Sequence, residues 1–126
     1  MDENQISRII VDAAIEVHRV LGGPGLLESV YEEALVHELK TRGLQVERQT
    51  AVEITYKDQR LSTPLRLDLL INNSVIVEVK AVETLAPVSR SQLLTYLRLS
   101  NKSLGLLINF GEKLVKDGIH RVVNNL

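Results

Sequence analysis

The sequence predicts an α/β fold in which helices cover the faces of a β-sheet. Through residues 6–42, apolar side chains recur every three or four positions, which is typical of amphipathic helices. From Val46 onward the chain is rich in β-branched residues that alternate with polar ones, as strands do. The predicted order is two helices, three strands, a helix and a strand (ααβββαβ), followed by a C-terminal tail.

Two amphipathic helices are expected at residues 6–21 and at about residues 26–42. The first should end at Gly22-Gly23-Pro24-Gly25, because glycine accepts positive φ and Pro24 cannot continue the helical hydrogen bonding. Gly43 is well placed to end the second helix.

Three strands should follow, the first at residues 46–56. Turn residues at 57–59 precede the second strand, which ends near residue 71, and the third covers residues 75–82. Pro87 opens a helix that reaches about residue 100, and residues 104–110 form a buried strand. The tail, residues 113–123, fits either a short strand or a helix.

The composition places limits on the compartment and on the possible chemistry. A chain of 126 residues is expected to form one domain, residues 1–126, and the lack of cysteine excludes disulfides and thiolate chemistry. The polar N-terminus does not resemble a signal peptide, and no apolar run approaches the roughly 20 residues of a membrane span. We therefore expect a cytoplasmic protein with no membrane partner.

Charge is distributed unevenly although the net charge is only −1. Residues 1–38 carry two basic and eight acidic side chains, whereas the remainder carries thirteen basic and eight acidic ones. Such asymmetry permits a basic face directed toward nucleic acid. Charge scattered over a solvated surface explains the same numbers equally well.

The hairpin formed by the second and third strands carries the candidate site. With a turn of three residues, Asn72-Asn73-Ser74, Asp68 faces Glu78 and their Cβ atoms are about 5 Å apart. Lys80 shares that face because side chains alternate along a strand. The opposite face is then apolar core, made of Leu67, Leu69, Ile71, Val75, Val77 and Val79. A turn of two residues would place the two acids on opposite faces.

Two adjacent carboxylates suggest a metal site. At about 4 Å and an effective dielectric near 20 they repel each other by roughly 4 kcal/mol, which Lys80 and a divalent cation would offset. Oxygen ligands suit Mg²⁺ or Mn²⁺, and such an ion can activate water toward a phosphodiester. Lys80 would orient or deprotonate that water, or stabilise charge in the transition state. Alternatively, the spacing arises by chance on an exposed strand.

These residues resemble a known signature. Asp68 followed by Glu78-Val79-Lys80 is similar to the D…(D/E)xK pattern of the PD-(D/E)XK nuclease superfamily, although Leu67 stands where the nominal proline would be. Gly25-Leu26-Leu27-Glu28-Ser29-Val30-Tyr31 resembles the motif of the GxxExxY family, which has the same fold, and the resemblance extends from about Ile6 to Val123. Gln92-Leu93-Leu94-Thr95-Tyr96 is similar to the Q-x-x-x-Y motif of the RecB-like branch. The resemblance implies a restriction-endonuclease-like core with a mixed β-sheet.

The resemblance also implies roles for individual residues. The catalytic residues would be Asp68, Glu78 and Lys80, and the metal ligands would be Glu28, Asp68, Glu78 and the main-chain carbonyl of Val79. Gln92, Tyr96 and Tyr31 would contact substrate or support the site. Glu28 has a simpler explanation, because an acidic side chain in the first turn of a helix interacts favourably with the helix dipole. Tyr31 also fits the apolar stripe of its helix.

Three functions remain open at this point. The first is an Mg²⁺- or Mn²⁺-dependent nuclease that hydrolyses phosphodiester bonds, with DNA as the expected nucleic-acid partner. The second is a catalytically silent nucleic-acid-binding or assembly module on the same fold, in which a homodimer is conceivable. An aromatic content of 3%, which leaves little for stacking unpaired bases, favours the second function. The third is a hydrolase of small phosphate esters.

Overall fold

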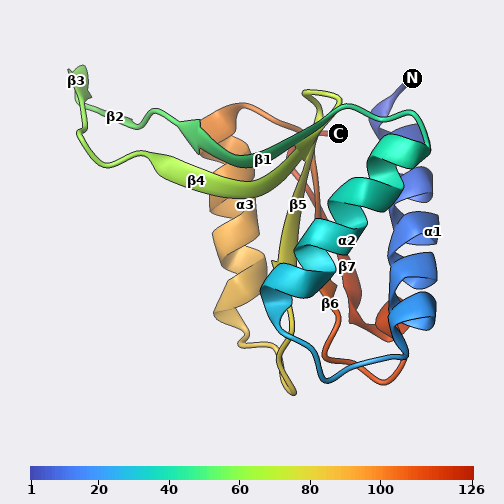
Figure 1. The fold of residues 1–126 in the computed structure, drawn as a ribbon. Coiled ribbons are helices and arrows are strands. Elements are labelled where there is room, and N and C mark those ends of the chain that lie inside the picture. Colours follow the sequence, from blue (N-terminus) through green and yellow to red (C-terminus); the bar gives the residue numbers. More distant parts are fainter.

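The computed structural model describes residues 1–126, and its centre is a five-stranded sheet with helices on both faces (Figure 1). The strand order is β1-β4-β5-β6-β7. β5 and β6 are parallel and the other neighbours are antiparallel, so the sheet is mixed. These strands are β1 (Val46–Val52), β4 (Leu65–Ile71), β5 (Val75–Lys80), β6 (Leu104–Asn109) and β7 (Ile119–Val123). The predicted α/β class is confirmed.

Two helices, α1 (Glu3–Leu21) and α2 (Glu28–Thr41), cover one face of the sheet. α1 begins earlier than expected because Asp2 and Gln5 form a capping box, in which the Gln5 N–H donates to the Asp2 carboxylate at 2.8 Å. α1 ends at Gly22, whose φ of 89° is left-handed. None of the helices has the length and apolar character that a membrane crossing requires.

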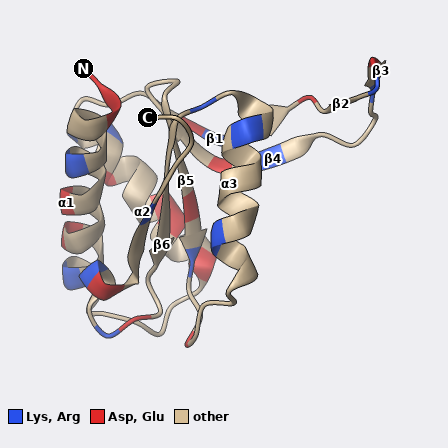
Figure 2. Ribbon diagram, turned by 180° about the vertical axis from the view of Figure 1, so that it is seen from behind, with Lys and Arg blue, Asp and Glu red and all other residues tan.

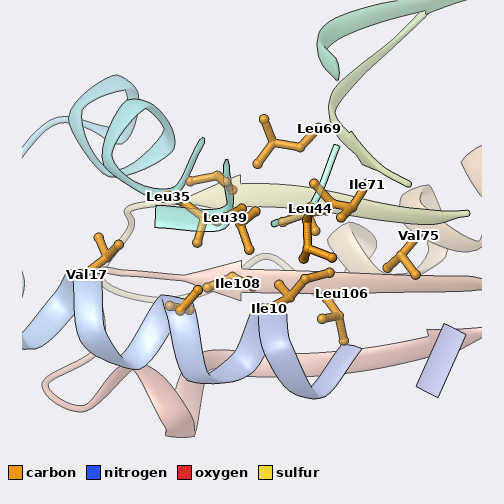
Figure 3. Packing of buried hydrophobic residues seen from close by; sticks show 14 of the residues in the cluster. Ile10, Val17, Leu35, Leu39, Leu44, Leu69, Ile71, Val75, Leu106 and Ile108 are labelled. Atoms are coloured by element: carbon orange, nitrogen blue, oxygen red, sulfur yellow. The ribbon is translucent and has the colours of Figure 1, made fainter. Parts of the chain in front are cut away.

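A large apolar cluster joins these two helices to the sheet (Figure 3). Ile10 from α1 and Leu39 from α2 point toward Ile71, Leu106 and their neighbours in the close-up view. A smaller cluster on the other side packs α3 (Val88–Ser100) against the sheet through Leu93 and Leu97. α3 therefore serves as the crossover between the parallel strands β5 and β6.

The strand predicted at residues 46–56 is divided in the structure, which corrects the sequence-based prediction. β1 ends at Val52, and the chain then forms a separate hairpin of β2 (Thr55–Tyr56) and β3 (Gln59–Arg60). Lys57 and Asp58 both have positive φ, as the two central residues of a type I′ turn do. We call residues 53–64 the arm, because this segment projects away from the body of the molecule (Figure 1).

The C-terminal tail resolves as a 3₁₀ helix, η1 (Val115–Gly118), followed by the strand β7. β7 pairs antiparallel with β6: Leu104 lies opposite Val123 at one end of the ladder, and Ile108 lies opposite Ile119 at the other. A strand forms here because it completes the hydrogen bonding of β6, whose side chains are all buried.

The hairpin of β4 and β5 has the predicted register. Its turn is Asn72-Asn73-Ser74, with both asparagines left-handed, and Ile71 pairs with Val75. The ladder between β4 and β5 ends where Leu69 pairs with Val77. The part of β4 before Leu69 pairs only with β1.

One residue of the predicted core face lies elsewhere. Leu69, Ile71, Val75, Val77 and Val79 join the cluster beneath α1 and α2 as expected, but Leu67 packs into the cluster beside α3. Because the ladder between β4 and β5 ends at Leu69, the preceding residues of β4 are not held in the plane of β5.

The segment that follows Lys80 is anchored by a buried asparagine at the end of β6. The Asn109 Oδ1 accepts hydrogen bonds from the N–H groups of Val82 and Gly111, both at 3.0 Å, while its amide donates to the Val82 carbonyl at 2.9 Å. The Phe110 N–H also donates to the Lys80 carbonyl at 2.8 Å. The chain is thereby fixed immediately beyond the catalytic candidates.

Gly111→Ala should destabilise the protein, because the new Cβ would lie 2.1 Å from the Val82 carbonyl oxygen. We expect a loss of about 1–3 kcal/mol in the free energy of unfolding, measured by urea denaturation. An alanine that fitted here would instead stabilise the fold by about 0.4–1 kcal/mol, so a gain in stability would contradict the close approach.

Candidate active site

Asp68 and Glu78 connect β4 and β5 at the point where the backbone ladder stops. The Asp68 N–H donates to Glu78 Oε2 at 2.9 Å, and the Val79 N–H donates to Asp68 Oδ2 at 2.9 Å. The two carboxylates therefore replace the missing backbone acceptors between the strands. Each is oriented by one backbone donor, and a side-chain hydrogen bond from Gln49 also favours the charged form of Asp68.

Burial is the main influence on the charge of both acids. It raises the pKa of Glu78, whose residue is 6% exposed, and the nearby Asp68 charge raises it further, to about 8. The pKa of Asp68 is also raised, mainly by burial, although the hydrogen bond from Val79 opposes this. The metal-free site consequently favours a proton on Glu78 at neutral pH.

Lys80 is half-buried at the end of β5, two residues after Glu78. Its positive charge lowers the pKa values of Glu28, Asp68 and Glu78, which shows that it lies close to all three. The predicted grouping of Asp68, Glu78 and Lys80 is therefore present in space. We regard the catalytic role of these three residues as a proposal.

The first turn of α2 adds another acid to this region. Glu28 is the first helical residue, and its pKa is raised by burial and by the charge of Asp68. Figure 2 shows acidic segments of α2 and β5 near each other in the middle of the molecule. The structure thus places Glu28 near Asp68, and its role as a metal ligand stays a prediction.

Glu32, one helical turn after Glu28, was missed by the sequence analysis. It is only 6% exposed and accepts hydrogen bonds from Arg48 at 2.8 Å and from Gln49 at 3.1 Å. Its charge contributes to the raised pKa values of Asp68 and Glu78. Its spacing of four residues from Glu28 was the one available signal, because such residues share a helix face.

Tyr31 lies in the core and not among the carboxylates. Its ring stacks on Phe110 with centroids 4.8 Å apart, and its hydroxyl donates to the Gly23 carbonyl at 2.7 Å. The Leu26 N–H donates to the same hydroxyl at 3.2 Å. Tyr31 therefore fixes the loop that leads into Glu28, and any support for the site is indirect.

The two predicted residues of α3 differ in their surroundings. Tyr96 is half-buried, and its pKa is raised by burial and then by the charges of Glu78 and Asp68, so it borders the site. Gln92 lies one turn earlier on the exposed helix surface and makes no hydrogen bond within the protein. Both remain candidates for contacts with substrate.

A divalent cation fits the chemistry of this donor set, although the ligands are not fully assembled. Glu28, Asp68 and Glu78 all have raised pKa values, and a nearby cation would offset the repulsion that contributes to each. No three acidic or histidine side chains are placed closely enough to hold an ion as they stand. Binding would require the acidic side chains to move closer together than they lie in this structure.

The mixed sheet, the helices on its faces and the acid pair at the end of the β4–β5 ladder together define a restriction-endonuclease-like fold. The model of the PD-(D/E)XK nuclease superfamily matches residues 4–122, and the chain belongs to this superfamily. Its members are generally nucleases that use divalent metal ions. No significant match was found among curated proteins or among solved structures.

Glu78→Gln should alter the pH dependence of stability in metal-free buffer. Because the pKa of Glu78 is raised to about 8 in the folded state, the wild-type free energy of unfolding should fall as pH rises from about 4.5 to about 8. The variant lacks this loss, so its Tm should exceed that of the wild type most clearly above pH 8. At about 1.4 kcal/mol for each pKa unit, the difference amounts to roughly 3–5 kcal/mol.

The matched control is Glu33→Gln, which changes an exposed carboxylate of α2 that makes no hydrogen bond or ion pair. This control should keep the wild-type pH profile. Parallel profiles of the wild type and Glu78→Gln would show that Glu78 is not electrostatically strained.

Proposed function

We propose that the protein is a divalent-cation-dependent nuclease that hydrolyses phosphodiester bonds in DNA, with Asp68, Glu78 and Lys80 at its centre. The observation that carries this proposal is the pair of carboxylates held between β4 and β5, of which Glu78 is buried and Asp68 is half-buried. The raised pKa of Glu78 shows that this arrangement is unfavourable for charge without a cation.

The residues that would hold the ion are Asp68, Glu78, the carbonyl of Val79 and, from α2, Glu28. A bound Mg²⁺ or Mn²⁺ would supply Lewis acidity toward the phosphoryl group and lower the pKa of water at the site. The backbone N–H groups of Asp68 and Val79 each hold one oxygen of a strand carboxylate, which would orient both carboxylates for a ligand.

Lys80 would act on the substrate and not on the ion. Its half-buried ammonium group is placed beside Glu28, Asp68 and Glu78, where it would donate to a phosphoryl oxygen or to the attacking water. The hydrogen bond from Phe110 to the Lys80 carbonyl holds the backbone of this residue in place. Preorganisation of this kind favours charge that develops in the transition state.

The lack of an enclosed cavity at the site favours a polymeric substrate. The three surface cavities have volumes of about 180 to 430 Å³, and none is lined by Asp68, Glu78 or Lys80. Small-molecule ligands are usually enclosed in a concave pocket. A nucleic-acid strand therefore fits better than a small phosphate ester, which would need an enclosing pocket.

The finer assignment to the GxxExxY family and the RecB-like branch is part of the same proposal. The proximity of Glu28 to Asp68 supports the first motif, and the proximity of Tyr96 to Glu78 supports the second. Gln92 would contact the substrate from the turn before Tyr96.

A catalytically silent binding or assembly module is the second candidate. The observation that favours it is the absence of three acidic or histidine side chains already close enough to hold an ion. In that case Asp68 and Glu78 would serve only to join the strands. Metal binding separates the two candidates.

Asp68→Asn should abolish both Mn²⁺ binding and DNA cleavage, because it removes a ligand charge from the proposed metal site. Lys80→Met should retain Mn²⁺ binding yet lose cleavage by at least about 100-fold, since the lysine acts on the reacting group. Mn²⁺ binding is measured by calorimetry, and cleavage is measured on single-stranded DNA, duplex DNA and RNA.

The matched control is Lys40→Met, on the exposed end of α2. It should resemble the wild type in both measurements, and circular dichroism should show that all variants are folded. Full cleavage by Asp68→Asn or Lys80→Met would reject the nuclease site. A folded wild type that does not bind Mn²⁺ would favour the silent module.

A further inference from the structure

The arm, residues 53–64, is a projecting feature that the catalytic proposal does not use. It leaves the sheet between β1 and β4 and extends beyond the body of the molecule in both overall views (Figures 1 and 2). Its strands β2 and β3 pair only with each other, and all four of their residues are exposed. An isolated two-stranded hairpin has little stability of its own, so a projecting one invites a functional explanation.

The arm is continuous with the candidate active site through β4. Leu65 and Leu67 pack into the cluster beside α3, so the alternation of side chains turns Arg66 and Asp68 to the other side of the strand. Arg66 is exposed, and its guanidinium donates to the Gln49 carbonyl at 3.3 Å without an acidic partner. A basic side chain thus follows the proposed catalytic acid on the way to the arm.

The outer part of the arm carries an exposed aromatic ring beside a lysine. Tyr56 is 60% exposed, and the Lys57 ammonium lies 5.5 Å from the centre of its ring. Arg60 pairs with Glu53 on the neighbouring stretch of the arm, which braces the hairpin. Tyr31 is buried and Tyr96 borders the carboxylates, so Tyr56 is the one tyrosine on a projecting surface.

We infer that the arm binds an unpaired nucleic-acid strand leading off the active site, with Tyr56 stacking on a base and Lys57 and Arg66 contacting phosphates. This inference rests on the proposed nuclease function and narrows its substrate to one with a single-stranded segment. Aromatic rings beside basic side chains are the usual means of holding such strands. The low aromatic content of the chain limits the number of stacking positions but leaves this one accessible.

The distance from the arm to the carboxylates suits several nucleotides. Arg60 and Asp68 are eight residues apart in the sequence, so at most about 29 Å of extended chain separates them. Single-stranded binding sites typically cover about 4–16 nucleotides for each binding domain. A strand of that length could reach from Asp68 past Arg66 to Tyr56.

The test measures binding of a 5′-fluorescein-labelled oligothymidylate by anisotropy in EDTA, where no cleavage occurs. Tyr56→Ala should weaken binding by about tenfold, and Tyr56→Phe should bind like the wild type, because the phenylalanine ring still stacks. Lys57→Gln should reduce the slope of log affinity against log salt by about 0.7, the value for one phosphate contact on a single strand. The matched control, Lys40→Gln on α2, should leave that slope unchanged.

The results separate the arm inference from the nuclease proposal. Wild-type affinity in Tyr56→Ala and an unchanged slope in Lys57→Gln would overturn the arm inference, even if Asp68→Asn abolishes cleavage. Weakened binding in Tyr56→Ala, together with a wild type that cleaves nothing, would reject the nuclease and retain the arm as a binding element. A concentration-dependent dimer that Tyr56→Ala dissociates, seen by sedimentation velocity, would assign the arm to a second copy of the chain and overturn the inference.

Discussion

Two carboxylate–backbone hydrogen bonds between β4 and β5 are the interaction on which the candidate site depends. In an ordinary antiparallel pair, the backbone carbonyls of one strand accept hydrogen bonds from the backbone N–H groups of the other. Here Asp68 and Glu78 accept instead, so the strands separate without leaving these two backbone donors unsatisfied. The separation explains why Leu65 and Leu67 of β4 pack toward α3.

The rest of the fold offsets the cost of this arrangement. Burying two carboxylates beside Glu28 and Glu32 is unfavourable, as the raised pKa values show. The apolar cluster between α1, α2 and the sheet consists of uncharged side chains, so its contribution does not depend on the charge of the site. A strained polar site can therefore persist on a scaffold that is stabilised elsewhere.

Periodicity and turn chemistry predicted most of the architecture. The apolar spacing located α1 and α2, and Pro87 indicated the start of α3. A three-residue turn, Asn72-Asn73-Ser74, was the condition for the register that brings Asp68 toward Glu78, and the structure has that turn. Leu67 was placed wrongly, because alternation assumes a flat continuous ladder and the end of the pairing at Leu69 has no signature in the sequence. The division of residues 46–56 was missed because Thr55 and Tyr56 favour a strand whether they join the sheet or the arm.

The candidate site was predictable only where a motif existed. Recognisable motif spacings include Asp68, Glu78, Lys80 and Glu28. The place of Glu32 depends instead on tertiary contacts with Arg48 and Gln49, which no motif in the sequence predicts. Tyr31 belongs to a motif, but its side chain lies in the core and its hydroxyl is hydrogen-bonded to the loop before α2. Motif membership alone therefore does not distinguish a residue in the site from one that shapes the approach to it.

The amide of Asn109 has a consequence for how the protein tolerates changes of charge. Unlike a carboxylate or an imidazole, an amide neither gains nor loses a proton in the ordinary pH range, so its bonds to Val82 and Gly111 persist while Glu78 changes its ionisation. The segment after β5 is thus held by hydrogen bonds of an uncharged amide, next to acidic residues whose charge depends on pH. A change in the ionisation of Glu78 therefore leaves the hydrogen bonds of Asn109 to the segment after β5 intact.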